Sequence, residues 1–396
     1  MRQRYKAVLS MLVGLAVVLL LNIYTGYIGS MQRQLQDLPE AVPVTATVSN
    51  LNGSLDAGLA IPEKTVERIQ NCPYVKDAVF TVQLYLGFGT FTTLNYEGKL
   101  NQFAAGTNAV QGIRGLKEEE ITWMDGTVRD FFDSDRRECV VDKMALTDNG
   151  LQVGDTVTLT IFYYRYGDYH EIFFEPLTIQ EYRITGCMDM EEYRGNVPVP
   201  SVLVPFRTVQ KEFREAGLPF TADSASFTVK DPFLLDAFKQ DMKDAGLLPV
   251  AATAEYRYDG NALTVRDSTF IQVSEHLQES LELMQAGLPL VLTVVAVIGY
   301  ITAYLLIQSR RGEYAVMRSL GLGKGQCFGV MFLETAMIQL CACIVGSIIA
   351  FAGMGAQPEA AGRAAAIFLS CYLSGTVISI WHMGRLSVMA ALSRQD

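Results

Sequence analysis

The segment SRRGEYAVMRSLGLGKGQ, residues 309–326, brings together the arginines, lysine and glycines that a phosphate-binding site uses. Its GLGKG sequence is similar to part of a phosphate-binding loop. A complete loop of that kind needs a glycine five residues before its Gly-Lys pair and a Ser or Thr directly after it. Arg318 and Gly325 occupy those two positions. We therefore expect that this chain does not bind ATP itself.

The other residues that could do chemistry do not form an active-site or metal-binding pattern. The three histidines, His170, His276 and His382, lack the spacing of metal ligands. The sequence contains neither Gly-x-Ser-x-Gly nor His-Glu-x-x-His. Four cysteines lie in long apolar runs, and the other three are Cys72, Cys139 and Cys187. An odd set allows at most one internal disulfide. The sequence predicts a non-catalytic protein with no cofactor or metal.

Residues 309–326 also have the pattern of an amphipathic helix. Such a helix places Val316, Met317 and Leu320 on one side and Arg311 and Arg318 on the other. The glycines at 321, 323 and 325 are expected to end it. A basic amphipathic helix can also simply anchor the chain at the inner membrane surface. The residue pattern by itself leaves both an anchor and a docking element open.

Glu334 lies eight residues into the apolar run that follows this segment. Eight residues of helix rise about 12 Å, and a carboxylate at the bilayer centre costs about 2.5–3.5 kcal/mol. One interpretation is that Glu334 lies near the inner boundary and pairs with a cation such as Arg318. The other is that this pair also transmits movement of the preceding helix.

Long apolar runs must place these residues in a membrane. A helix needs about 20 apolar residues to cross a bilayer. Half of the chain is hydrophobic, and the longest apolar runs are 7–28, 286–307, 327–354 and 364–381. Basic residues precede the first run, as in a signal peptide, but no small-residue cleavage site follows it. We expect four transmembrane helices, the first of them retained as an anchor.

Basic residues mark the cytoplasmic ends of membrane spans. Here they flank the spans in the N-terminal segment, the 308–326 link and the C-terminal tail, which are therefore expected in the cytoplasm. Residues 30–283 are expected outside, and they hold 22 of the 32 Lys and Arg and 38 of the 42 Asp and Glu, a net charge of −16. The whole chain has a formal net charge of −10, and an acidic chain has little with which to neutralise the phosphates of a nucleic-acid partner. The segment is long enough to bury its own core.

The outer segment has the mixed pattern of an α/β domain. Helices are expected over 62–70, 142–147, 205–216 and 231–246, and strands over 75–86, 156–166, 169–184, 224–229 and 250–258. Gly167-Asp168 predicts a hairpin between two of these strands. An apolar stripe along 268–285 predicts a helical stalk that continues into the second span.

The expected division of the chain follows from these patterns. It comprises 1–29 as the N-terminus and first span, 30–267 as the outer domain, 268–285 as the stalk, 286–307, 327–354 and 364–381 as spans, 308–326 as the cytoplasmic link, 355–363 as an outer loop, and 382–396 as a cytoplasmic tail.

The order of these parts, together with the cytoplasmic link, resembles the FtsX-like and MacB-like ABC transporter permeases. In those families an Arg-rich start, a glutamate and an "lR-lG" segment precede the third span. The matching positions are Arg310, Arg311, Glu313, Val316, Met317, Arg318, Leu320 and Gly321. VVDKMALTDNGLQVGDTVTL, residues 140–159, is similar to a segment of the MacB-like periplasmic core domain. Glu334 matches an acidic position of these permeases. The tail 386–392 is similar to their closing segment but lacks its proline.

This resemblance implies that the cytoplasmic link forms a coupling helix that docks on a separate ABC ATPase subunit. It also implies an inserted second lobe in the outer domain and a permease that works as a homo- or heterodimer in the plasma membrane. ATP-driven motion of the outer domain is then expected to export or extract a substrate. Two alternatives remain: a transmembrane regulator that activates an extracellular cell-wall hydrolase or signalling partner, and a receptor without an ATPase.

Overall fold

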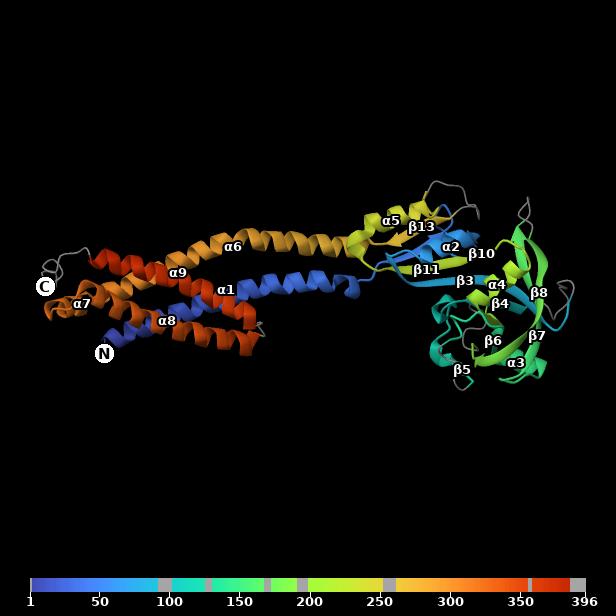
Figure 1. Cartoon of the computed structure of the whole chain (residues 1–396), viewed down its shortest axis with the longest axis horizontal. Helices are drawn as coiled ribbons and strands as arrows, with labels where there is room; N and C mark the ends of the chain where they lie inside the picture. The colour runs from blue at the N-terminus through green and yellow to red at the C-terminus, as the bar shows by residue number, and fades with distance from the viewer. Residues whose placement is uncertain are drawn as a thin grey trace. The chain divides into compact units, whose positions relative to one another are not determined.

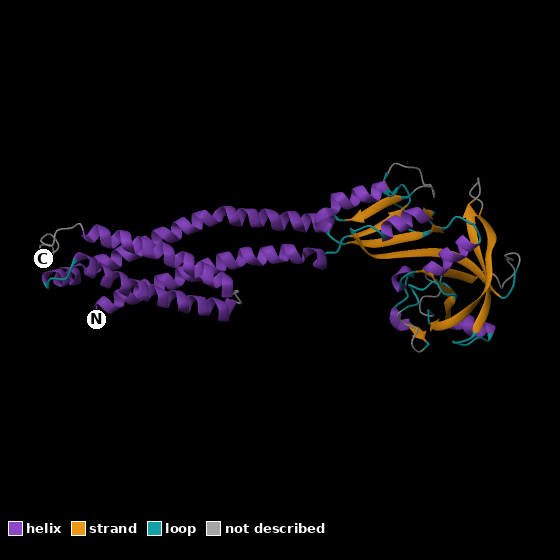
Figure 2. Cartoon of the chain, viewed as in Figure 1, coloured by secondary structure: helices purple, strands orange, loops and turns teal. Residues whose placement is uncertain are grey.

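The chain divides into a helical unit and a unit built on a β-sheet. The computed structural model describes residues 2–91, 102–124, 130–166, 172–190, 199–251, 261–354 and 358–384. Met1–Leu38 and Gln272–Asp396 form the first unit, and Pro39–Ile271 forms the second. Figures 1 and 2 show the long helices of the first unit and the strands of the second.

Long apolar helices make up the helical unit. They are α1 (Arg2–Ala41), α6 (Ser268–Ser309), α8 (Lys324–Met354) and α9 (Pro358–Gly384), with the short α7 (Arg311–Ser319) between α6 and α8. By length and composition, α1, α6 and α8 can each cross a membrane, whereas α9 contributes a shorter apolar stretch, Ala365–Trp381. Three expected spans thus have helices of sufficient length, and the fourth stays a prediction.

An apolar core holds the helices of this unit together. Its buried members come from α1, α6, α8 and α9: Val17, Val18, Leu21, Val295, Ala303, Cys343, Phe368 and Tyr372. Many other apolar side chains of these helices are exposed, as is usual for residues that face lipid. The helix α6 is continuous from Ser268 to Ser309, and the role of residues 268–285 as a stalk stays a prediction.

The second unit contains one large mixed sheet. Its strands are β1 (Thr45–Ser49), β3 (Val75–Phe88), β4 (Gln102–Thr107), β5 (Ile121–Trp123), β6 (Glu138–Asp142), β7 (Thr156–Tyr166), β8 (Ile172–Met188), β9 (Val202–Pro205), β11 (Ser224–Val229), β12 (Leu248–Pro249) and β13 (Ala262–Arg266). A separate pair is formed by β2 (Ile61–Pro62) and β10 (Thr221–Ala222). The order of the large sheet is β12-β13-β1-β11-β3-β4-β9-β6-β8-β5, and β7 pairs with both β3 and β8.

These pairings divide the sheet into two parts that share β3. The strands β3, β4, β9, β6, β8 and β7 pair in succession and return to β3, so they form a closed ring. The other part is the open sheet β12-β13-β1-β11, which joins the ring where Ser224 of β11 pairs with Thr81. Further along β3, Tyr85 pairs with Phe162 of β7. The strand therefore leaves the open sheet and enters the ring within a few residues.

Short helices lie between the strands. They are α2 (Glu63–Gln70), α3 (Lys143–Asn149), α4 (Phe206–Glu215) and α5 (Leu235–Asp244), with 3₁₀ turns at Val110–Gly112, Glu118–Glu120 and Pro232–Leu234. The helix α4 packs against strands of the ring. A Cβ on Gly106 of β4 would lie 2.8 Å from the Val209 side chain of α4. The absence of a side chain at Gly106 is what lets this helix approach the sheet.

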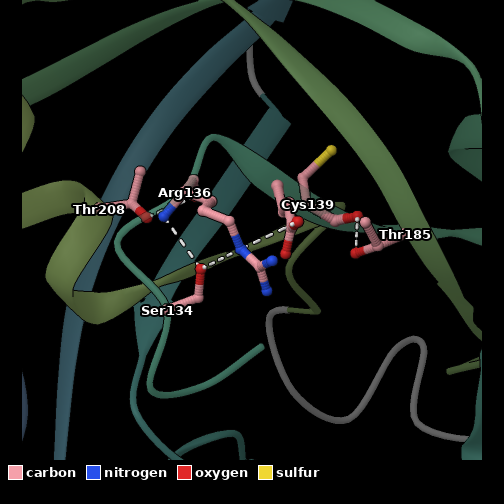
Figure 3. A network of polar contacts seen from close by, with 6 residues as sticks. Ser134, Arg136, Cys139, Thr185 and Thr208 are labelled. Carbon is pink, nitrogen blue, oxygen red and sulfur yellow. Dashed lines mark hydrogen bonds and ion pairs between the residues drawn. The ribbon is translucent and has the colours of Figure 1, made fainter. Parts of the chain in front are cut away.

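Polar contacts fix the loop before β6 to α4, and β6 itself to β8 (Figure 3). The Thr208 hydroxyl of α4 donates to the carbonyl oxygen of Arg136 at 2.7 Å, and the Thr185 hydroxyl of β8 donates to that of Cys139 at 3.3 Å. Next to this network, Arg137 Nε donates to Glu212 Oε1 of α4 at 2.6 Å. Because Glu212 is buried, this ion pair satisfies a charge that would otherwise be costly inside the protein.

The strands and helices expected from the sequence are largely present. The strands over 156–166 and 224–229 have the predicted bounds, and all four short helices exist. The hairpin residues Gly167 and Asp168 lie outside the described residues, although β7 and β8 pair antiparallel as expected. The strand expected over 250–258 lies mostly outside them, and its described residues Val250 and Ala251 are not in a strand.

Candidate functional site

The expected docking segment forms a short helix with a sharp end. The helix α7 follows α6 directly, and Arg310 is its N-cap residue. It ends where the N–H of Leu322 donates to the Met317 carbonyl oxygen at 3.2 Å, with Gly321 at φ +87°. A left-handed glycine after the last turn is a common helix end. The sequence expectation is wrong for Gly325, which lies inside α8.

One side of α7 packs into the helical unit. Tyr314 is buried in a cluster with Ile307 of α6, Cys327 and Met331 of α8 and Ile380 of α9, and Met317 packs against this cluster. Apolar contacts of this kind hold the helix firmly, because moving it would expose the buried side chains. The helix α7 is therefore attached to α6, α8 and α9 by packing as well as by its chain connections.

The opposite side of α7 is exposed and partly apolar. Val316 and Leu320 are 56% and 76% exposed, and Glu313 is also exposed. The sequence pattern placed Val316, Met317 and Leu320 on one side, whereas the structure separates Met317 from the other two. Positions 313, 316 and 320 follow helical spacing, so they form one stripe. An apolar stripe with a carboxylate is suited to binding another protein.

Glu334 of α8 forms an ion pair, but its partner is Arg310. Arg310 Nη1 lies 2.6 Å from Glu334 Oε2, with the arginine side chain 12% and the glutamate side chain 52% exposed. Arg318, the partner suggested from the sequence, instead donates through Nη1 to the Leu322 carbonyl oxygen at 2.8 Å. The pair joins the residue that begins α7 to the helix α8. Arg310 was identified from the sequence as part of the link, but only the fold brings it to Glu334.

The sequence did not single out a second carboxylate, Asp223 in the sheet unit. It lies between β10 and β11, where β3 passes from the open sheet to the ring, and it accepts hydrogen bonds from the Gln83 N–H and the Tyr164 hydroxyl. Burial raises the pKa of Asp223 to about 7, although both hydrogen bonds act in the opposite direction. A lone aspartate in a sequence gives no signal of such burial.

The described residues offer no metal site or disulfide. Among them, no group of three or more His, Cys, Asp and Glu side chains could hold a metal ion. Cys72, Cys139 and Cys187 are all free thiols. Burial raises the pKa of each of these thiols, which disfavours the reactive thiolate. This arrangement suits packing rather than catalysis by the three cysteines.

Two family models cover most of the chain. The model described as "MacB-like periplasmic core domain" matches residues 7–245, and the model described as "FtsX-like permease C-terminal" matches residues 287–393. The chain belongs to the MacB/FtsX-like ABC transporter permease family. Its members are generally non-catalytic, multi-pass membrane subunits with a periplasmic domain, in transporters whose ATPase is a partner. No curated protein matches the chain.

The solved structures with some similarity to this chain include two outer regions of transport proteins. The periplasmic region of MacB from Actinobacillus actinomycetemcomitans is 12% identical over 59% of this permease and 92% of its own chain, with a TM-score of 0.32. The extracellular domain of the ABC-type transporter YknZ from Gram-positive bacteria is 15% identical over 51% of this permease and 89% of its own chain, with a TM-score of 0.27.

Proposed function

We propose that this permease converts ATP hydrolysis by a separate ATPase subunit into movement of its outer domain, and that α7 is its coupling helix. The movement serves export or extraction of a substrate on the outer side. The permease works with a second permease copy, with four spans per copy and both termini in the cytoplasm. Substrate need not cross a membrane pore in this mechanism.

The two-sided environment of α7 carries this proposal. Its inner side is packed against α6, α8 and α9, and its outer side presents Glu313, Val316 and Leu320. A partner that binds the exposed stripe and moves must displace α7, and the packed side passes that displacement to its neighbours. A helix that merely lay on the inner leaflet would need no such firm attachment.

A single helix, α6, connects α7 to the outer domain along the chain. The ion pair between Arg310 and Glu334 joins α7 to α8. On its N-terminal side, α7 is connected to α6. The helix α6 extends without a break from Ser309 back to Ser268, directly after β13. Pro289 lies inside this helix and removes one of its backbone hydrogen bonds, but the helix continues on both sides of the proline and so connects α7 to β13. Displacement at α7 is therefore expected to reach the outer domain.

The exposed stripe gives a direct test. We expect the double variant Val316→Glu and Leu320→Glu to reach the membrane normally but to lose the ATPase that co-purifies with the unaltered chain. Both side chains are exposed, so the changes leave the buried cluster intact. The matched control replaces Leu248 and Val250, exposed residues of the sheet unit, with glutamate and should retain the ATPase.

Replacing Arg311 and Arg318 with glutamate would be a less specific test of the same helix. The Arg318 guanidinium holds the Leu322 carbonyl oxygen, so its replacement also disturbs the end of α7. If the double glutamate variant at 316 and 320 binds the ATPase with unaltered affinity, α7 is not the coupling helix, and the membrane-anchor interpretation applies.

A further inference from the structure

Three polar side chains meet inside the helical unit. Gln339 of α8 is fully buried, and its Nε2 donates to the Ser10 hydroxyl of α1 at 3.0 Å and to the Ser10 carbonyl oxygen at 3.2 Å. The Ser10 hydroxyl lies 3.4 Å from the hydroxyl of Tyr372 on α9. Ser10 and Tyr372 are buried as well. This network connects α1, α8 and α9 by side-chain hydrogen bonds.

Glycines bring α1 and α8 close together at Gln339 and again two turns further along α8. A Cβ on Gly14 of α1 would lie 2.1 Å from Gln339 Oε1, so any larger residue must displace the amide. A Cβ on Gly346 of α8 would lie 3.0 Å from a side-chain atom of Val18 on α1. Small residues allow such close approach of helices in membranes.

Packing alone does not explain a glutamine at this position. Gln339 Oε1 is buried and has no hydrogen-bond partner within the part of the chain that the structure describes. An unpaired buried amide oxygen is unfavourable, and an apolar side chain of similar volume would avoid it. What glutamine provides, and leucine does not, is the pair of hydrogen bonds to α1.

We infer that Gln339 is a positioning residue that locks α1 to α8, so that the two helices move together when α7 is displaced. This inference rests on the proposed function. The helix α7 is connected through the chain to α6 and α8, but not to α1. The helix α1 leads into β1, just as α6 follows β13. Without the lock, force from α7 reaches the outer domain mainly through α6.

A disulfide between α1 and α8 can report this lock. We choose Val18→Cys with Gly346→Cys, in a chain whose native cysteines are replaced by alanine. The Cβ position at Gly346 lies 3.3 Å from the Val18 Cβ, close to the separation of about 3.5–4.5 Å in disulfides. In membranes containing the complete transporter, we expect equal cross-linking rates with and without ATP. Adding Gln339→Leu should lower the rate about threefold or more, since hydrogen bonds between membrane helices are lost.

Two serine variants complete the cross-linking test. Ser10→Ala removes one acceptor of the Gln339 amide and should lower the cross-linking rate less than Gln339→Leu. It also serves where the glutamine variant does not insert. The matched control is Ser370→Ala on α9, whose exposed hydroxyl donates to the Ile367 carbonyl oxygen of its own helix; it should leave the rate unchanged.

A second readout separates a lock from a purely structural role. The Gln339→Leu chain, without the cysteine pair, should keep its ATPase and the rate of ATP hydrolysis, but should lose the ATP-dependent change in hydrogen exchange at residues 42–49, which follow α1. A cross-linking rate that depends on ATP in the parent pair, or that Gln339→Leu leaves unchanged, would overturn the lock. The cross-linking rates with and without Gln339→Leu can also be compared in membranes that lack the ATPase. That comparison tests the lock even if the proposed function is wrong.

Discussion

Two carboxylates in this permease differ in their partners: one pairs with a cation and the other has only neutral hydrogen-bond donors. Glu334 lies in a membrane helix and is paired with Arg310, whose side chain is largely buried. Asp223 lies in the sheet unit, and its hydrogen-bond donors, the Gln83 N–H and the Tyr164 hydroxyl, are both neutral. A buried carboxylate with neutral donors, such as Asp223, is more easily protonated than one exposed to water. Each arrangement predicts a different response to substitution.

At Glu334, removal of one member of the pair should be worse than removal of both. Glu334→Gln leaves the Arg310 cation in its buried place without an anion, and we expect a loss of about 1–3 kcal/mol in unfolding free energy. Arg310→Met combined with Glu334→Leu should lose less, since no unpaired charge remains. Thermal unfolding of the purified permease in detergent measures both. A double variant that loses as much stability as Glu334→Gln, or more, would contradict this prediction.

Because of Asp223, the unfolding free energy of the protein should fall as the pH rises. The pKa of the folded protein is about 7, against 3.8 for the unfolded chain, so the folded state binds the extra proton. Its contribution to the unfolding free energy is therefore full below about pH 4 and is lost as the pH rises to about 7, by roughly 4 kcal/mol at most.

Asp223→Asn should remove that pH dependence. The amide oxygen can still accept from the Gln83 N–H, and the amide group can donate to the Tyr164 oxygen. Comparison of unfolding midpoints at pH 5 and pH 8 gives the result. The wild-type chain should lose more stability than the variant between these values. An identical change in both proteins would place the pKa of Asp223 near that of an exposed aspartate.

Among the helices and strands, caps and close contacts fix details that hydrophobic patterns leave open. The helix α3 begins after Asp142, whose carboxylate accepts from the Met144 N–H at 3.0 Å, and ends at Gly150 in the left-handed region. Both signals were present in the sequence. The sequence did not predict that Met317 is separated from Val316 and Leu320 on α7. Periodicity shows which residues share a side of a helix but not what covers that side.

The cap of α3 gives a prediction for this helix. Asp142→Ala removes the acceptor for the first turn and should lower the unfolding free energy by about 1 kcal/mol, whereas Asp142→Ser should retain most of it. Thermal unfolding of the two variants distinguishes them. The replacement of an exposed residue of the same helix, Asp148→Ala, is the control and should change little. Equal losses at 142 and 148 would argue against a capping role.

For the whole molecule, the proposed topology can be tested with the native thiols. Cys72 and Cys139 are buried, and Cys187 is partly exposed. A membrane-impermeant maleimide added to intact cells should therefore label Cys187 but not the other two until the domain unfolds. A tag after Asp396 should be accessible only from inside. External access to that tag would mean that the number of spans is odd.

The purified permease should also lack ATP hydrolysis. Arg318 stands where a phosphate-binding loop has its first glycine, and Gly325 follows Lys324 where that loop has a Ser or Thr, so the loop is incomplete. A preparation free of other ATPases, assayed with and without the partner ATPase, provides the measurement. Hydrolysis by the permease alone would contradict its assignment as the non-catalytic subunit.

Local sequence patterns were enough to predict the long apolar helices, the mixed α/β character of the outer domain and the short helix that links α6 to α8. Apolar length decides whether a helix can span a bilayer, and alternation or helical periodicity within a few residues decides strand or helix. The incomplete phosphate-binding loop is equally local, because Arg318 occupies its first glycine position and Gly325 follows Lys324 where a Ser or Thr is needed.

Which distant residues meet depends on the folded chain. The closed ring through β3, β4, β9, β6, β8 and β7 depends on pairings between strands that are remote in sequence. The pairing of Glu334 with Arg310 instead of Arg318 depends on where α7 ends, and the contact of Gln339 with Ser10 spans 329 positions. The hydrophobic effect depends on the apolar area that is buried and not on which residues bury it. The particular contacts are therefore decided only when the whole chain packs. A single sequence carries no local signal for them.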